Sequence, residues 1–265
     1  MAQDSEEQPS NPADRALRFV VGITSLLKSI LAEIRFPRLL VLLYRDVGFG
    51  ILPVPFLGFL RVPSVYEREV TRTWKPRTGD TVVDIGSYMG KYSILSSRIA
   101  STIVAIEPHP DNFELLILNL RFTRSRRVKA VNAIITNHDG TDRLFESNHP
   151  STHSVLPSEK ARPIDLPCYT LDSLLESLGI SCVDLIKIDV EGADLQVLTG
   201  MTKTMNRSGD LKMIIELDHD ELGEIRDLKT LLELLGANGF QALPVGIDNH
   251  GHPRHLLALR AQTVQ

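Results

Sequence analysis

The stretch TVVDIGSYMG, residues 81–90, is a short β-branched run that ends in a carboxylate followed by two glycines. The run predicts a buried strand. The glycines predict a tight turn in which the backbone can come close to a ligand. The next stretch, KYSILSSRIA at residues 91–100, reads as a helix. A strand, a glycine turn and a helix in this order are typical of a parallel α/β sheet.

The alternation of strands and helices continues to the end of the chain. We expect strands at residues 102–108, 127–135, 183–192 and 211–217, helices at 109–122, 193–205 and 224–240, and two final strands at 240–246 and 254–261. Alternating elements imply a parallel sheet covered on both faces, and two successive strands imply a terminal antiparallel hairpin. The predicted fold is therefore α/β and Rossmann-like, a doubly wound sheet of seven strands.

Before this domain the composition changes. Residues 1–14 are polar, acidic and contain proline, which predicts disorder. Residues 15–62 form an apolar extension, expected to be helical because apolar side chains recur at helical spacing. Its charged residues argue against a membrane-spanning helix. Two interpretations stay open: helices packed on the domain at 63–265, or peripheral membrane contact through residues 16–60.

Composition and net charge limit the classes of protein to which this chain can belong. The chain has 265 residues, a net charge of −4 and a pI near 6.1, ordinary values for a globular protein and not the basic balance of a nucleic-acid binder. The basic run at residues 121–129 is interpreted as a solvated helix end and loop. Two cysteines make no disulfide framework, which fits a cytoplasmic, reducing setting.

Acidic residues fall where such sheets bind ligands, beyond the carboxyl ends of the strands. In the turn after the first strand the order is D-x-G-x-x-x-G, with Asp84 before Gly86 and Gly90. A dinucleotide fingerprint reads G-x-G-x-x-G and presents a helix N-terminus to a pyrophosphate. S-adenosyl-L-methionine has no phosphate, and its ammonium and sulfonium groups favour a carboxylate.

Two further landmarks follow in the same order as the strands. Glu107 ends the second predicted strand, where an acid can accept hydrogen bonds from both hydroxyls of a ribose. Asn132 and Ala133 lie in the third predicted strand near its end, where the backbone can line an adenine. Together the landmarks predict S-adenosyl-L-methionine as the cofactor.

At these residues the sequence resembles the FkbM family of methyltransferases, over roughly residues 65–259. The strongest likeness is TLDSLLESLGISCVDLIKIDVEGADLQVLTGM at 170–201, and VVDIGSYMGKYS and AIEPHPDNFELLILNL match the family's cofactor segments. The resemblance implies a class I methyltransferase fold, dependence on S-adenosyl-L-methionine, and O-methylation of a hydroxyl on a sugar, glycolipid or small metabolite.

The resemblance also implies further contacts with the cofactor, at Glu67, Ser87, Tyr88 and Pro108. The family commonly has Ala-Asn where this chain has Ser87-Tyr88. This departure lies beside the methionine part of the cofactor and puts the local loop geometry in question.

The candidate catalytic residues follow the fourth and fifth predicted strands. In LIKIDVEG, Lys187 and Asp189 share one side of the strand by period-two alternation. One interpretation makes Asp189 a general base or substrate anchor with Glu191 close by; the other makes Asp189 a cofactor contact and Glu191 a helix-start acid. His219 is a further candidate base, since the unperturbed pKa of histidine lies near neutrality.

Substrate contacts are expected from two other places. By resemblance, Glu216 corresponds to the family's acid at the fifth strand, and Ser154, in a long polar segment, lies near the substrate. Oxygen ligands from Asp189, Glu191 and Glu216, with His219, could gather a divalent cation. Nothing in their spacing requires one, and we expect none.

Two other functions stay in view. An NAD(P)-dependent oxidoreductase would need the G-x-G-x-x-G loop, which is absent from the first turn. A non-catalytic Rossmann-like binding module would keep the fold without the chemistry. Asp84, Gly86, Gly90, Glu107 and Asp189 together favour the methyltransferase.

Overall fold

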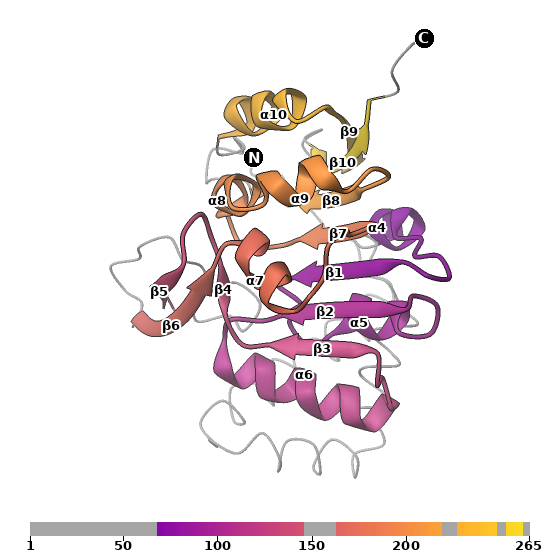
Figure 1. Ribbon diagram of the computed structural model, residues 1–265, viewed down its shortest axis with the longest axis vertical. Coiled ribbons are helices and arrows are strands. Elements are labelled where there is room, and N and C mark those ends of the chain that lie inside the picture. The colour runs from indigo at the N-terminus through magenta and orange to yellow at the C-terminus, as the bar shows by residue number, and fades with distance from the viewer. Residues whose placement is uncertain (1–67, 146–162, 219–226, 248–252, 262–265) are drawn as a thin grey trace, which may run out of the picture. The chain divides into compact units, whose positions relative to one another are not determined.

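The structure is a computed structural model that describes residues 68–145, 163–218, 227–247 and 253–261 (Figure 1). The predicted disordered N-terminus and apolar extension lie outside the described residues, so both stay predictions. Among the described residues, no helix has the length and hydropathy needed to cross a membrane.

Seven strands form the main sheet, in the order β3-β2-β1-β7-β8-β10-β9. They are β1 (Thr81–Ile85), β2 (Thr102–Ile106), β3 (Val128–Val131), β7 (Leu185–Ile188), β8 (Lys212–Glu216), β9 (Phe240–Ile247) and β10 (Pro253–Arg260). Five strands run parallel, and β10 is antiparallel to both of its neighbours, β8 and β9. The predicted α/β doubly wound sheet with its terminal antiparallel hairpin is confirmed.

Helices cover both faces of the sheet because its strands are apolar on both sides. One face packs on α4 (Arg68–Thr73), α5 (Lys91–Ser96) and α6 (Pro110–Thr123), and the other on α7 (Leu171–Ser177), α8 (Asp194–Thr199), α9 (Thr202–Arg207) and α10 (Leu228–Ala237). Within β1, Val82 packs on the face covered by α4 and α5, and Val83 packs on the face covered by α7 to α10, as period-two alternation requires. Asp84 therefore faces the same side as Val82.

The strand predicted at 127–135 is wrong as a single element. It divides into β3 and β4 (Ile134–Ile135), and β4 belongs to a second sheet with β6 (Pro163–Tyr169) and β5 (Gly140–Phe145), in the order β4-β6-β5. The chain turns at Asn132, whose side-chain amide donates to the carbonyl oxygens of Glu107 and Pro108 at 2.8 and 2.7 Å. This three-stranded sheet lies beyond the carboxyl ends of the main strands (Figure 1).

The helix predicted at 193–205 is also two elements, α8 and α9. At the break, a Cβ on Gly200 would lie 2.1 Å from the carbonyl oxygen of Thr136, so the chain passes too close to the second sheet for a side chain. The carboxylate of Asp172 then accepts the backbone N–H groups of Lys203 and Thr204 at 2.9 and 2.7 Å. These contacts begin a new helix, as a capping carboxylate does at a helix N-terminus.

Candidate active site

The turn after β1 is wedged between the carboxyl ends of β2 and β7. Gly86 has φ +75°, and a Cβ there would lie 1.7 Å from the backbone oxygen of Asp189. The N–H groups of Gly86 and Ser87 both donate to the carbonyl oxygen of Ile106, at 3.0 and 2.9 Å. Only glycine fits this approach, because the obstacle is backbone and cannot move aside.

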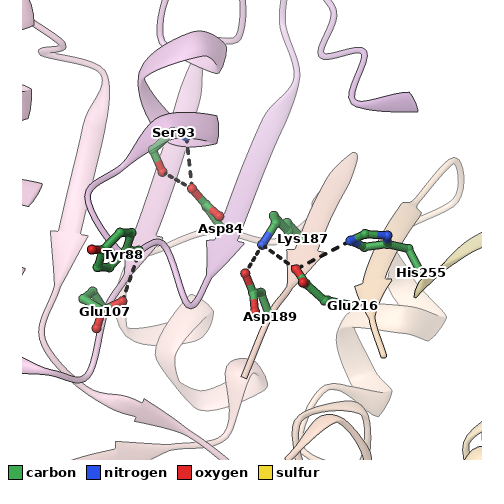
Figure 2. A network of polar contacts seen from close by, with 8 residues as sticks. All are labelled: Asp84, Tyr88, Ser93, Glu107, Lys187, Asp189, Glu216 and His255. Carbon is green, nitrogen blue, oxygen red and sulfur yellow. Dashed lines mark hydrogen bonds and ion pairs between the residues drawn. The ribbon is translucent and has the colours of Figure 1, made fainter. Parts of the chain in front are cut away.

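The next residues of the turn also adopt left-handed backbone conformations. Tyr88 has φ +48°, and its N–H donates to the Oε2 atom of Glu107 at 2.8 Å (Figure 2). Gly90, with φ +88°, precedes the first residue of α5, and its N–H donates to the carbonyl oxygen of Ser87 at 2.7 Å. The loop is therefore held by backbone groups, by the buried carboxylate of Glu107, and by the side-chain amide of Asn119, which donates to the carbonyl oxygen of Met89 at 2.8 Å.

Glu107 follows β2 and is 5 % exposed. Its Oε1 atom accepts the N–H of His109 at 3.0 Å and lies 3.4 Å from the side-chain nitrogen of Asn112. Burial raises the pKa of Glu107 to about 7, although the hydrogen bonds from Tyr88 and His109 act in the opposite direction. A carboxylate has about four acceptor positions, so it can still accept hydroxyl donors.

Asp84 lies on β1 and is 1 % exposed. Its Oδ2 atom accepts the N–H and the hydroxyl of Ser93 at 3.0 and 2.6 Å. Its Oδ1 atom is buried and has no hydrogen-bond partner among the described residues. Burial raises the pKa of Asp84, while the neighbouring Lys187 charge and the bonds from Ser93 oppose the rise. One oxygen of this carboxyl group is thus available to a donor.

Three residues predicted to contact the cofactor, Pro108, Asn132 and Ala133, lie near the carboxyl ends of β2 and β3. The two hydrogen bonds of the Asn132 amide tie the end of β3 to the end of β2. Ala133 is buried, 1 % exposed, and directly precedes β4. These contacts fix the backbone at this point, and the predicted contact with the adenine stays a prediction.

A buried lysine organises the carboxyl ends of β7 and β8. Lys187 is 4 % exposed, and its Nζ atom lies 2.5 Å from the Oδ2 atom of Asp189 and 3.8 Å from the Oε2 atom of Glu216 (Figure 2). Burial alone would lower the pKa of Lys187, but the charges of Asp189 and Glu216 together raise it above its ordinary value. The ammonium therefore stays charged inside the protein.

The pKa values of the two carboxyl groups beside Lys187 are shifted in opposite directions. Burial raises the pKa of Asp189, the charge of Glu216 adds to the rise, and Lys187 opposes it. Burial would also raise the pKa of Glu216, but the hydrogen bond from His255 and the charge of Lys187 lower it overall. Neighbouring titratable groups with separated pKa values are a pattern of acid–base sites. Of the two carboxyl groups, Asp189 is therefore the weaker acid.

His255 is a residue that the sequence analysis missed. It lies on β10, is 4 % exposed, and pairs directly with Glu216 in the antiparallel register. Its Nε2 atom is 3.5 Å from the Oε2 atom of Glu216. The only available signal was the alternation of the last strand, and this could not be used without knowing that β10 lies beside β8.

More acidic side chains gather around the turn that precedes α8. Glu191 has φ +52°, and burial, followed by the charges of Asp218 and Asp189, raises its pKa to about 8. Asp194, which the sequence analysis did not single out, is 7 % exposed, and its pKa is raised well above its ordinary value by burial and by Asp218. This mouth of the site is rich in carboxyl groups and has Lys187 as its buried cation.

Three predicted site residues, Glu67, Ser154 and His219, lie outside the described residues and stay predictions. In the parts of the chain that are described, no three side chains of His, Cys, Asp or Glu are placed to hold a metal ion together.

The model of the "Methyltransferase FkbM domain" family matches residues 84–242, more than half of the chain. This chain belongs to the FkbM methyltransferase family. The match confirms the predicted family and, with it, S-adenosyl-L-methionine as the cofactor. It also sets the oxidoreductase alternative aside.

Curated relatives of this FkbM chain are distant. It is 28 % identical over 131 residues to the hexuronic acid methyltransferase AglP of Haloferax volcanii, covering 48 % of this chain and 52 % of that protein. It is 27 % identical over 154 residues to the methyltransferase sdnD of Sordaria araneosa, covering 45 % and 60 %. The chain thus spans little more than half the length of these two relatives.

Among solved structures, an FkbM methyltransferase from Methylobacillus flagellatus KT superposes with a TM-score of 0.53 at 16 % identity. The alignment covers 76 % of this chain and 49 % of that one. At this identity the likeness concerns the fold alone.

The turn after β1 also shows how this chain accommodates Tyr88, where its sequence departs from that of the family. The family commonly has asparagine at this position, and asparagine adopts the left-handed conformation more readily than most residues. In this chain Tyr88 adopts a left-handed backbone with φ +48°, held by its bond to Glu107. The loop therefore accommodates the tyrosine at a cost in backbone strain.

Proposed function

We propose that this chain is an S-adenosyl-L-methionine-dependent methyltransferase that methylates a hydroxyl oxygen on a sugar, glycolipid or small metabolite. The observation that carries the proposal is the pairing of two sites at one edge of the sheet. Asp84 lies on β1 and Glu107 follows β2, on the cofactor side. The cluster of Lys187, Asp189 and Glu216 lies at β7 and β8.

The residues on the cofactor side suit this cofactor. The free Oδ1 atom of Asp84 is a buried acceptor that a cationic donor would satisfy, and Glu107 can accept hydroxyl groups of a ribose. The turn from Gly86 to Gly90 has left-handed backbone at Gly86, Tyr88 and Gly90, and its two glycines let the backbone come close to a ligand. When bound, S-adenosyl-L-methionine supplies an activated methyl carbon, and the protein supplies positions and protons.

Asp189 is our candidate general base. A hydroxyl is a weak nucleophile at neutral pH, so removal of its proton during attack lowers the barrier. The pKa of Asp189 is raised towards the working range of such a base, and Lys187 at 2.5 Å stabilises the carboxylate form that accepts the proton. Glu191, with a pKa of about 8, is the alternative base on the neighbouring turn. If Asp189 instead contacts the cofactor, Glu191 takes this role.

The charge around the site favours a hydroxyl acceptor over a carboxylate one. Glu191, Asp194, Glu216 and Asp218 surround Asp189, and their mutual repulsion already raises the pKa values of several members. A carboxylate brought here would add to that repulsion. If the acceptor is a uronic acid, as the name of the AglP relative suggests for that protein, we expect methylation of a ring hydroxyl.

The catalytic domain is proposed to occupy residues 63–265, and the family match at 84–242 falls within it. The apolar extension before this domain is proposed either to pack on it as helices or to make peripheral membrane contact through residues 16–60. Glu67 and Ser154 are proposed to contact cofactor and substrate, and His219 to assist proton transfer.

Calorimetric titration tests the cofactor. We expect the full chain to bind S-adenosyl-L-methionine and not NADH, and Glu107→Ala to weaken the binding. Glu114→Ala removes an exposed glutamate of α6 and is the matched control. Binding of NADH alone, or equal affinity in Glu107→Ala and the parent chain, would contradict the cofactor site as drawn.

Asp189→Asn tests the base. We expect it to abolish methyl transfer while S-adenosyl-L-methionine still binds, because the amide keeps the shape but cannot take a proton. Turnover is measured by mass spectrometry of a panel of neutral and uronic-acid glycosides after incubation with the cofactor. Asp165→Asn, on an exposed part of β6, is the control. Near-normal turnover in Asp189→Asn would remove Asp189 from this role and direct attention to Glu191.

A further inference from the structure

A groove distinct from the carboxyl-end site lies between α6 and β3, the edge strand of the main sheet. Its volume is about 460 Å³. Its walls combine apolar and cationic side chains, including Ile117, Leu120, Val128, Arg121, Arg124 and Arg126. Figure 1 shows α6 running alongside β3 at this edge. The proposed methyl transfer assigns no role to the groove.

The cations at the groove form no ion pair with any residue that the structure describes. Arg121, Arg124, Arg126 and Lys129 are exposed, and within the described parts of the chain no carboxylate forms an ion pair with any of them. From residue 115 to residue 138 the sequence has five basic residues and no acidic one, although the whole chain carries a net charge of −4. Such a segregated charge attracts an anionic partner.

Large apolar side chains project beside these cations. Phe122 is 60 % exposed and Ile99 is 44 % exposed. The loop after α5 and the loop after α6 meet here, because the Ser97 and Ser125 hydroxyls are 3.0 Å apart and the guanidinium of Arg127 donates to the carbonyl oxygen of Ala100 at 3.2 Å. The loop that carries Ile99 therefore meets the loop that carries the cations, and Phe122 directly follows Arg121 in the sequence.

We propose that this surface, defined by the α6–β3 groove with Phe122 and Ile99, docks on an anionic phospholipid bilayer. Exposed arginines beside projecting apolar side chains are the combination that an interface of charged headgroups and acyl chains accommodates. A nucleic-acid duplex would neutralise the arginines but offers no apolar phase to Phe122 and Ile99. The lipid surface is therefore the partner that the whole set of side chains fits best.

The proposed docking surface lies away from the candidate active site. The loops that carry it precede β2 and β3 at the amino ends of the strands, whereas Glu107, Asp189 and Glu216 lie at the carboxyl ends. Docking at this edge leaves the candidate active site uncovered. The proposal does not depend on the reaction that the site performs.

Vesicle binding tests the charge contribution. The full chain is floated with vesicles of phosphatidylcholine alone or of phosphatidylcholine and phosphatidylserine in equal amounts. We expect binding to the anionic vesicles only, weakened by added salt. Each arginine near an anionic membrane surface contributes a similar favourable free energy to binding. Removing three of them in Arg121→Gln/Arg124→Gln/Arg126→Gln is therefore expected to weaken binding on the order of 100-fold.

The matched control removes the same charge from exposed lysines on other elements. Lys203→Gln/Lys212→Gln/Lys229→Gln, on α9, β8 and α10, should bind anionic vesicles like the parent chain. Equal losses in the two triple variants would mean a general charge effect and would overturn the proposal. Undiminished binding of the arginine variant would also overturn it and would transfer the contact to the extension at residues 16–60.

Fluorescence tests whether the apolar side chain enters the bilayer. The chain has one tryptophan, Trp74, which is 5 % exposed, so Phe122→Trp adds a reporter against a buried background. We expect a blue shift on anionic vesicles and none on neutral ones. Binding of a single-stranded RNA with no shift on either vesicle would overturn the lipid assignment in favour of nucleic acid.

Discussion

The two halves of the candidate site are built from different interactions. On the cofactor side, the turn after β1 is held mainly through its backbone. The N–H groups of Gly86 and Ser87 donate to the carbonyl oxygen of Ile106, and the N–H of Tyr88 donates to the Glu107 carboxylate. On the acceptor side, at β7, β8 and β10, side-chain charges make the contacts, with Lys187 at their centre.

The difference teaches how each half can be disturbed. A backbone-built turn fails when a side chain occupies the space of the turn. A cluster of buried charges fails when one partner is removed or neutralised, because the others are left uncompensated. Substitutions therefore separate the two halves.

The largest effect is expected from Gly86→Ala, on the backbone-built side. The new Cβ would lie 1.7 Å from the backbone oxygen of Asp189, so the turn must move. We expect a loss of about 3 to 5 kcal/mol in the free energy of unfolding, measured by urea titration, and loss of cofactor binding. Gly79→Ala has a similar left-handed φ but nothing within 4 Å, and should cost only about 1 kcal/mol. Equal costs would show that the close approach is not needed.

The next effect is a dependence of stability on pH, attributed to Glu107. Unfolded, this group releases its proton near its ordinary pKa of 4.5, and folded near about 7. Between these values the folded state holds more protons, so stability falls as pH rises, by about 3 kcal/mol in all. The raised pKa values of Asp189 and Glu191 act in the same direction. Glu216 has a lowered pKa, so its contribution is lost only as pH falls below 4.5.

Urea titrations from pH 4.5 to pH 8 measure this dependence. We expect Glu107→Gln to remove the part of the fall that this group contributes, since the amide does not titrate, and the exposed Glu114→Gln to leave the fall unchanged. A fall of the same size in Glu107→Gln would assign it to the carboxyl groups of the acceptor side instead.

Lys187→Met should disturb the acceptor side and leave the cofactor turn in place. Removing one partner of a buried ion pair costs about 3 to 5 kcal/mol, but the side chains of Asp189 and Glu216 are 29 % and 41 % exposed. Solvent screening of the two carboxylates reduces our expectation to about 2 kcal/mol. Lys229→Met, at an exposed lysine of α10, is the control for urea titration. Cofactor affinity should stay within a few-fold; its complete loss would contradict the separation into two halves.

The smallest effect is a gain of stability on the cofactor side. Tyr88→Asn places a residue that tolerates φ +48° in the turn, and we expect about 0.5 to 1 kcal/mol of added stability. Tyr88→Ala removes the ring without that tolerance and separates backbone strain from side-chain contacts. If the alanine variant gains as much as the asparagine variant, the ring and not the backbone is the source of strain.

How much of the molecule could be predicted follows the same division. Strand β1, its glycine turn and Glu107 are close together in the sequence, and the spacing of acid and glycines is enough to find them. The sequence identifies Asn132 as a landmark. It does not show that the chain turns at this residue and that the predicted strand is therefore two strands. The break between α8 and α9 depends on the approach of Gly200 to Thr136, which no local pattern records.

The sequence by itself determined the sheet, its terminal hairpin, the cofactor turn and the family, because local periodicity, glycine positions and strand-end acids carry that information. The tertiary structure decided which charges meet. Asp84, Lys187, Glu216 and His255 come from four strands, and they become neighbours only because β1, β7, β8 and β10 pair side by side in a fixed register. Burial in that row then sets their acidities, since desolvation and Coulomb interactions depend on distances that no single segment defines.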